Sequence, residues 1–189
     1  MINADLSHVT SLEDFYKEIR RQQEEAHGSD YCEQHDAIVN YMMDCNSYKE
    51  LGTHQGGTAA CAILQKPKFV ELVDNDMSRY RKFLKPLAEK YCKDNKIELS
   101  VKEVDSTSLA SLGWTVDMLL IDSYHKWFHM EKELKTHHMF VRKYMIMHDT
   151  ASVPELAAGI DRWCIDNPSW KVVERSQNNC GYTVIKKES

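Results

Sequence analysis

Residues 48–58, with the sequence YKELGTHQGGT, constrain the fold of this chain more than any other stretch. They join a short predicted strand to the apolar run 59–64, and they contain Gly52, Gly56 and Gly57. Such a stretch is typical of a strand that turns tightly into a helix, because glycine adopts backbone angles that other residues avoid. A ligand can approach the bare main chain there, and the free N–H groups at the start of the helix then face it.

Four aspartates mark the ends of predicted strands around and after this loop. Apolar and β-branched runs predict strands at 48–51, 69–73, 97–104, 118–121 and 142–147. The aspartates that follow the last four of these are Asp74, Asp105, Asp122 and Asp149. One aspartate at a strand end is more often a turn former than a functional residue. Four in register with a glycine loop indicate a ligand site, since ligands of parallel sheets bind beyond the carboxyl ends of the strands.

Helical periodicity alternates with these strands and predicts an α/β fold. Helices are expected at 59–65, 78–95, 127–138 and from Val153 to Asn167, with a short helical turn at 108–112 and with Pro86 bending or restarting the helix that contains it. Five strand–helix alternations with short loops predict a mostly parallel sheet with helices on both faces. The last two strands, 171–175 and 182–186, flank a tight turn and predict an antiparallel hairpin.

Two helices are expected ahead of the glycine loop, so the chain divides into residues 1–46 and a ligand-binding domain at 47–189. The helices would flank the sheet edge or cover the site. Capping boxes are predicted at Thr10 with Glu13 and at Ser152 with Glu155, and Asp30 is expected to cap the second helix.

The composition limits the class of protein. With 189 residues the chain is long enough for one full domain, and its net charge of −5 without a basic patch gives no electrostatic support for nucleic-acid binding. No apolar run approaches the ~20 residues that cross a bilayer, and the first ten residues lack a signal-peptide core. The six cysteines form no CxxC pair, which predicts reduced thiols in a cytoplasmic protein and argues against a zinc or disulfide framework.

The end of the second strand suits a nucleoside ligand. Asp74 lies 22 residues after Gly52. An acid at that position can accept two hydrogen bonds from the 2′,3′-diol of a ribose. The combination of this acid with the glycine loop favours a ribose contact over a solvated turn aspartate.

The ordered motifs of the chain resemble a known family. ELGTHQGGT, ELVDND, EVDS, LLIDSYH and MIMHDT follow one another in the order seen in S-adenosylmethionine-dependent methyltransferases, whose Rossmann-like sheet has seven strands. The closer resemblance is to metal-dependent O-methyltransferases grouped with macrolide-sugar and rhamnosyl O-methyltransferases and cephalosporin hydroxylase-like proteins. It covers about residues 48–186. It implies transfer of a methyl group from S-adenosylmethionine to a hydroxyl of a sugar or another small molecule.

The resemblance also implies a cofactor site. Glu50 would face the ammonium group of the methionine moiety, Asp74 would hold the ribose, and Asp105 would accept a hydrogen bond from the exocyclic amine of adenine. The other cofactor contacts would come from Gly52, Thr53, Gly57, Thr58, Ser106 and Asp122.

A divalent cation, magnesium or manganese, is implied at Asp122, His148 and Asp149, with His125 as the general base three residues after the first ligand. A free histidine titrates near pH ~6.5, so His125 is expected to be mostly neutral at pH ~7, and more so beside a cation. His148 stands where several members of the family have an acid. Imidazole suits softer divalent metals than magnesium.

Three other functions remain open. A nicotinamide oxidoreductase is disfavoured, because the loop lacks the G-x-G-x-x-G spacing. A non-haem iron oxygenase could use Asp122, His125 and His148 as one carboxylate and two imidazoles. A non-catalytic nucleoside-binding or assembly protein is the third. The acceptor site would come from the N-terminal helices, the loop after Asp149 or a second subunit of a homo-oligomer.

Overall fold

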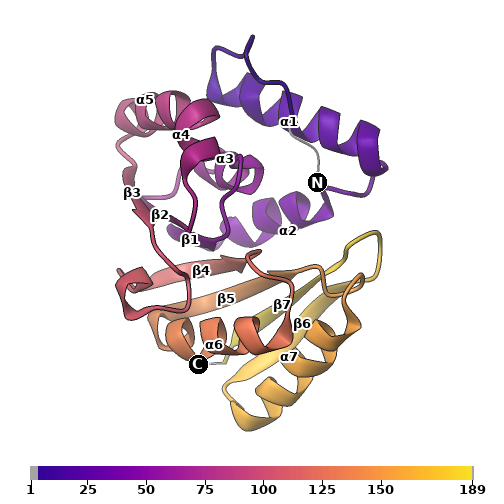
Figure 1. Cartoon of the computed structure of the whole chain (residues 1–189). Coiled ribbons are helices and arrows are strands. Elements are labelled where there is room, and N and C mark those ends of the chain that lie inside the picture. The colour runs from indigo at the N-terminus through magenta and orange to yellow at the C-terminus, as the bar shows by residue number, and fades with distance from the viewer. Residues whose placement is uncertain (1–3, 189) are drawn as a thin grey trace.

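The computed structural model describes residues 4–188, which form one seven-stranded sheet with helices on both faces (Figure 1). The strands are β1 (Ser47–Leu51), β2 (Phe69–Asp74), β3 (Glu98–Glu103), β4 (Val116–Ile121), β5 (Val141–His148), β6 (Trp170–Ser176) and β7 (Tyr182–Lys187). The helices are α1 (Leu12–His27), α2 (Glu33–Met42), α3 (Gly57–Leu64), α4 (Ser78–Phe83), α5 (Lys85–Asn95), α6 (Trp127–His137) and α7 (Pro154–Asp166). Short 3₁₀ turns cover Leu109–Ser111 and His138–Phe140.

The strand order is β3-β2-β1-β4-β5-β7-β6. The first five strands in this order are parallel, whereas β7 is antiparallel to both β5 and β6. The predicted α/β sheet and its C-terminal antiparallel hairpin are therefore confirmed. The order reverses between β1 and β4, which is where parallel sheets of this kind open a crevice for a ligand.

The helices form two layers. Figure 1 shows α1 to α5 on one side of the sheet and α6 and α7 on the other. Phe15 and Ile19 of α1 and Ile38 of α2 share one buried cluster with Tyr48 of β1, and Ile160 of α7 belongs to the cluster on the opposite face. The two N-terminal helices therefore share a core with the sheet. Within residues 4–188, no helix is long and apolar enough to cross a membrane.

The predicted caps of the first two helices are wrong. The N-cap of α1 is Ser11, whose hydroxyl accepts a hydrogen bond from the Asp14 N–H at 3.1 Å, so the box begins one residue later than Thr10. The N-cap of α2 is Cys32, and it makes no side-chain capping bond. Asp30 contributes only its main-chain carbonyl, which accepts from the Glu33 N–H.

The start of α7 also departs from the prediction. Its N-cap is Val153, which makes no side-chain capping bond. The predicted cap, Ser152, does not serve the helix because its hydroxyl donates to Asp149 Oδ1 at 3.1 Å. The turn after β5 thus takes the serine away from the helix. In the earlier helical stretch, α4 ends before Leu84 and α5 restarts with Pro86 in its first turn, as expected.

Candidate functional site

The glycine loop lies directly against the end of β4. Gly52 has a φ of +93°, and a Cβ atom at this position would lie 2.0 Å from the main-chain oxygen of Asp122. The Asp122 N–H also donates to the carbonyl of Leu51 at 2.9 Å. Only glycine permits both this backbone conformation and this approach. The loop therefore brings its bare main chain against the first of the predicted metal ligands.

Two adjoining hollows flank this contact. The larger, about 390 Å³, is lined by Gly52, His54, Asp74, Asn75, Asp105, Ser106, Asp122, Ser123, Tyr124, His125 and His129. The smaller, about 50 Å³, is lined by residues 52–58 of the loop, by Asp122 and His148, and by Ile19, Gln23, Tyr31, Gln34 and His35 from α1, α2 and the segment between them. Gly52, His54 and Asp122 line both. The two hollows thus form the arms of one site, and the N-terminal helices cover the smaller arm.

Asp74 is fixed at the wall of the larger arm. Its Oδ2 accepts from the His54 N–H at 2.8 Å and its Oδ1 from the Asp76 N–H at 3.0 Å. Each carboxylate oxygen has two lone-pair positions, so both can accept a further hydrogen bond from a ligand. The carboxylate is held in place by the main chain and can still bind a diol.

Asp105 and Ser106 lie beside each other in the same arm. Two hydrogen bonds from Thr107, its N–H at 2.7 Å and its hydroxyl at 2.8 Å, hold the pKa of the Asp105 carboxyl below its usual value. The Ser106 hydroxyl donates to Oε1 of Glu133 at 2.5 Å. The same oxygen lies 3.2 Å from Nε2 of His129, so a buried acid and an imidazole together fix Ser106 at the wall of this arm.

Glu50 lies beneath the glycine loop and lines neither hollow. It is fully buried, and its Oε2 accepts from the Tyr48 hydroxyl at 2.7 Å. Burial raises the pKa of its carboxyl to about 8. Its predicted contact with an ammonium group stays a prediction.

Unpaired polar atoms surround the loop. In the part of the chain that the structure describes, Glu50 Oε1, Thr53 Oγ1 and His35 Nδ1 are buried without a hydrogen-bond partner. Buried polar atoms are nearly always paired in native proteins. Thr53 and His35 also line the smaller hollow, so their unpaired atoms fit a ligand that carries polar groups along the loop, as S-adenosylmethionine does.

A cluster of two aspartates and two histidines lies where the arms meet. His125 Nε2 is 2.9 Å from Asp149 Oδ2 and 3.5 Å from Asp122 Oδ1. His148 Nδ1 is 3.2 Å from Asp122 Oδ1 and 3.3 Å from Asp149 Oδ2. Ligand atoms of Asp122, His125 and Asp149 all lie within 4.8 Å of one another, so a divalent cation held by the two carboxylates would lie beside the His125 imidazole.

Without a cation, the cluster holds protons. Hydrogen bonds to Asp122 and Asp149 raise the pKa of His125 to about 10. Burial by itself would lower the pKa of His148, but the charges of Asp122 and Asp149 and the hydrogen bonds to them together outweigh burial and raise this pKa to about 10. The expectation that His125 is neutral at pH ~7 is therefore wrong for the metal-free protein, because both carboxylates face this ring. Asp149 also adopts a left-handed φ of +61°, a strained conformation of the kind that clusters at functional sites.

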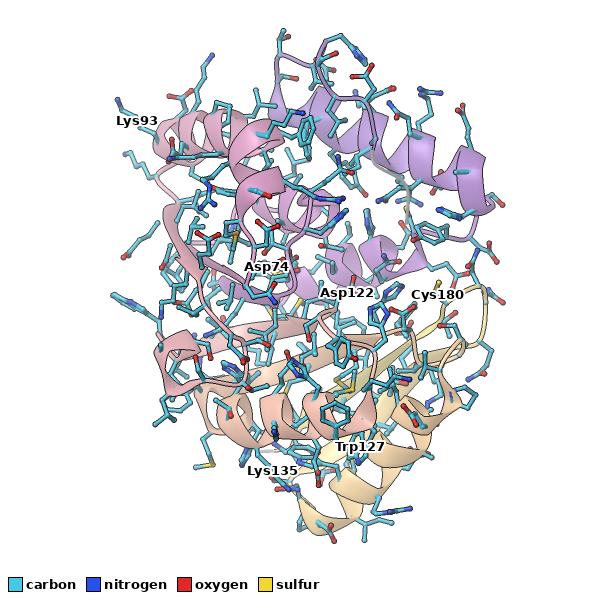
Figure 2. The ribbon with its side chains drawn as sticks, viewed as in Figure 1. Asp74, Lys93, Asp122, Trp127, Lys135 and Cys180 are labelled. Atoms are coloured by element: carbon cyan, nitrogen blue, oxygen red, sulfur yellow. The ribbon has the colours of Figure 1, made fainter. Side chains whose placement is uncertain are left out.

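Cys180 is a neighbour of this cluster that the sequence reasoning missed. Its thiol, His148 and Asp149 offer ligand atoms within 4.8 Å of one another. Figure 2 shows Asp74, Asp122 and Cys180 in a row across the middle of the molecule, between the two helical layers. The signal was present in the predicted hairpin, whose turn contains the cysteine. What could not be read was that β7 would pair with β5 and so carry this turn to Asp149.

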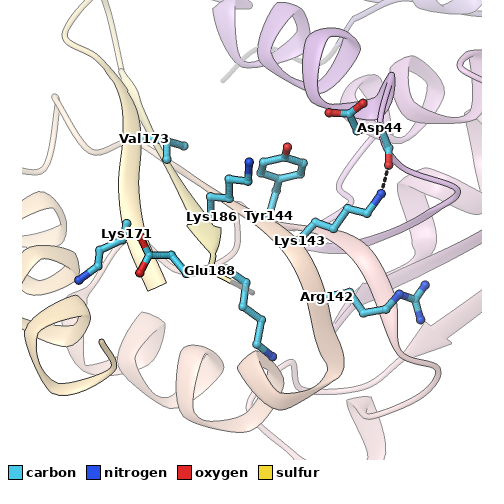
Figure 3. A pocket seen from close by; sticks show the side chains of 9 residues that line it. Asp44, Arg142, Lys143, Tyr144, Lys171, Val173, Lys186 and Glu188 are labelled. Atoms are coloured by element: carbon cyan, nitrogen blue, oxygen red, sulfur yellow. Dashed lines mark hydrogen bonds between the residues drawn. The ribbon is translucent and has the colours of Figure 1, made fainter. Parts of the chain in front are cut away.

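A further hollow, of about 1050 Å³, lies at the opposite end of the sheet (Figure 3). Its lining is rich in cations, from the start of β5 and from β6 and β7: Arg142, Lys143, Lys171, Lys186 and Lys187. Several already have partners, since Arg142 donates to Asp117 at 2.7 Å and Lys186 lies over the ring of Tyr144. None of the predicted site residues lines this hollow.

Several solved structures with the same fold are described as methyltransferases. A Staphylococcus aureus protein assigned as a caffeoyl-CoA O-methyltransferase superimposes with a TM-score of 0.67 at 14% identity, over 96% of this chain and 94% of that one. An O-methyltransferase from Bacillus cereus in complex with SAH gives 0.63 at 12% identity, over 96% and 94%. An N-methyltransferase from Bradyrhizobium japonicum in complex with S-adenosyl-L-homocysteine gives 0.61 at 12% identity, over 94% and 97%.

These comparisons identify the fold. The chain has the seven-stranded Rossmann-like fold of class I S-adenosylmethionine-dependent methyltransferases. No family model matches the sequence, and no curated protein matches it.

Proposed function

We propose that this protein is an S-adenosylmethionine-dependent methyltransferase that methylates a hydroxyl of a sugar or another small molecule with the help of a divalent cation. One observation carries the proposal. The two arms of the site meet at Asp122, with the glycine loop along one arm, Asp74 and Asp105 in the other, and His125 and Asp149 beside the junction.

Binding of the cofactor would rest on groups that the fold holds in place. Asp74 would accept two hydrogen bonds from the ribose diol, and Asp105, with Ser106 beside it in the same arm, would accept one from the adenine amine. The N–H groups after Gly52 would face the methionine end. S-adenosylmethionine itself supplies a methyl group that is already electrophilic. Catalysis therefore requires mainly positioning and removal of the acceptor's proton.

The cluster at the junction suits proton removal. Asp122 and Asp149 would hold the cation, which lowers the pKa of a hydroxyl bound to it. Once a cation takes up the charge of these carboxylates, they no longer hold His125 in its protonated form. Its Nε2, 2.9 Å from Asp149 Oδ2, is then free to accept a proton at the edge of the site.

The site also bears on the acceptor. Asp74 and Asp105 give the larger arm negative charge that neither the histidine cluster nor a bound cation offsets, which disfavours a phosphate backbone. The neighbours with this fold include proteins described as an O-methyltransferase, an N-methyltransferase, an RNA methyltransferase and a ribosomal protein methylase. The choice of a hydroxyl therefore rests on the carboxylate–histidine cluster, and the choice of a sugar on the motif resemblance.

Calorimetric titration with S-adenosylmethionine, S-adenosylhomocysteine and NAD tests the cofactor. We expect binding of the first two and none of NAD. Turnover of a panel of sugar and phenolic hydroxyl acceptors, with and without a chelator, tests the chemistry. Binding without turnover on any acceptor would favour a non-catalytic binder, and oxygen consumption with ferrous iron would favour an oxygenase.

A further inference from the structure

His148, Asp149 and Cys180 bring a nitrogen, an oxygen and a sulfur ligand atom within 4.8 Å of one another. The pairing of β5 with β7 sets this arrangement, since His148 lies opposite Tyr182 at the end of the ladder. The turn between β6 and β7 is thereby placed beside the residues that follow β5. The fold thus adds Cys180, which lies far along the chain, to the adjacent residues His148 and Asp149.

The main chain fixes the position of Cys180. Its carbonyl oxygen accepts from the N–H groups of Ala151 at 2.9 Å and Ser152 at 3.1 Å. The next residue, Gly181, has a φ of +66°, and a Cβ atom there would lie 2.4 Å from the Cβ of Ala151. The turn is therefore packed against the segment after Asp149 too closely for a larger residue at 181.

We propose that Cys180 is a metal ligand at this edge, together with His148 and Asp149, and that the protein takes a thiophilic divalent cation of the zinc class in preference to magnesium. Thiolate and imidazole are soft or intermediate ligands that select such metals, whereas magnesium prefers oxygen ligands. On binding, the thiol loses its proton to solvent and the thiolate donates an electron pair to the cation.

The ligand set also leaves room for a substrate. Zinc is commonly four-coordinate, and catalytic zinc sites use three protein ligands with the fourth position open. Asp149 belongs both to this set and to the set formed with Asp122 and His125. A cation held by Cys180 would therefore lie beside the junction of the two arms. This inference deepens the proposed function, on which its catalytic meaning rests, but the binding of metal can be measured without turnover.

Alkylation of the intact protein tests the thiol directly. Cys180 and Cys164 are both partly exposed, whereas the other four cysteines are buried, so Cys164 on α7 is a matched internal control. Treatment with iodoacetamide, followed by mass spectrometry of the peptides, gives the rate at each cysteine. We expect zinc, but not magnesium, to slow alkylation of Cys180 and to leave Cys164 unchanged. Equal rates at Cys180 with and without saturating zinc would overturn the proposal.

Metal titration of Cys180→Ala and Cys164→Ala provides a second test. Loss of one ligand should weaken zinc binding by at least about 10–100-fold, the range seen for loss of a group that merely supports a ligand. Magnesium affinity should not change. Cobalt in the wild type and in Cys164→Ala should give a thiolate-to-metal charge-transfer band that Cys180→Ala lacks. Unchanged zinc affinity in a folded Cys180→Ala would again contradict the proposal.

Titration of the same variants with S-adenosylhomocysteine separates the two proposals. If that ligand binds and Cys180→Ala keeps its zinc affinity, only the thiol assignment fails. If that ligand does not bind the wild type at all, the proposed function fails, whatever the zinc result.

Discussion

The Nε2 atom of His125 lies 2.9 Å from the Oδ2 atom of Asp149. Asp122 Oδ1 lies 3.5 Å from the same nitrogen, so one ring faces two carboxylates that each come from the end of a different strand. A proton on the imidazole and a cation between the carboxylates both neutralise the negative charge of Asp122 and Asp149. Their occupancies are therefore coupled, and stability, metal affinity and pH dependence follow from this contact.

The first prediction concerns the stability of the metal-free protein. The pKa values of His125 and His148 are raised to about 10 in the folded state, above the ~6.5 of a free histidine. A raised pKa gives stability that is fully present below pH ~6.5 and is lost as pH rises through about 10. We therefore expect the urea concentration at the midpoint of unfolding to decrease as the pH is raised from ~6.5 to about 10.

His125→Ala should make that fall shallower, since His148 alone then remains. His8→Ala, at an exposed position on the N-terminal segment, is the control and should keep the wild-type slope. A slope that is the same in His125→Ala and wild type would show that the imidazole is not paired with the carboxylates.

The second prediction concerns the cofactor. Asp74→Ala should weaken binding of S-adenosylmethionine by ~1–3 kcal/mol, which is the cost of losing hydrogen bonds to a charged group. Because Asp74 also accepts from the N–H groups of His54 and Asp76, Asp74→Asn, which keeps one acceptor oxygen, separates loosening of the loop from loss of the ligand contact. Calorimetry of both variants provides the measurement, and Asp166→Ala, at an exposed position of α7, is the control. Wild-type affinity in folded Asp74→Ala would remove this residue from the site.

The third prediction uses two glycines of the same loop. Gly52→Ala would place a Cβ atom 2.0 Å from the Asp122 oxygen at a φ of +93°, and should cost at least the ~1–3 kcal/mol of a strained backbone residue. Gly57→Ala is the matched control, since its Cβ atom would meet Ile19 at an ordinary 3.5 Å. Thermal unfolding should show a large loss for the first and little change for the second. Equal losses in both variants would contradict the inference that the close contact between Gly52 and the Asp122 main chain requires glycine at position 52.

Most of the site could be predicted because its signals are local. Gly52, Asp74, Asp105 and Asp122 each follow a strand that its own apolar run predicts, and the carboxyl ends of parallel strands meet at one edge. The topology therefore gathers residues whose positions along the chain are each readable. The family resemblance then supplied their roles, which the residues alone did not.

The misses have a common physical origin in tertiary contacts. Cys180 reaches Asp149 only because β7 inserts between β5 and β6, and a hairpin signal does not say which strand it will join. Ser152 failed as a helix cap because Asp149 binds its hydroxyl. The expected charge state of His125 was wrong for the metal-free protein because two carboxylates from distant strands face it, and a reference pKa contains no such neighbours.

The final prediction concerns proton removal by His125. In the metal-loaded protein with saturating cofactor, His125→Ala should slow the chemical step by roughly 10²–10⁴-fold, the usual contribution of a general base, with nearly unchanged affinity for S-adenosylhomocysteine. Single-turnover kinetics isolates that step from product release. The wild-type rate should rise with pH through one ionisation, because only the neutral imidazole accepts a proton.

The midpoint of that rise should lie below 10. Without metal, the two carboxylates raise the pKa of His125 to about 10, and a cation that neutralises them removes this effect. The ionisation should vanish in His125→Ala. The competing account is that His125 serves only as an ion-pair partner of Asp149. Under that account the variant would lose metal-free stability at pH ~7, and its metal-loaded form would keep both the wild-type rate and the wild-type pH profile, because the cation would replace the lost charge. Such a result would assign proton removal to another group or to solvent.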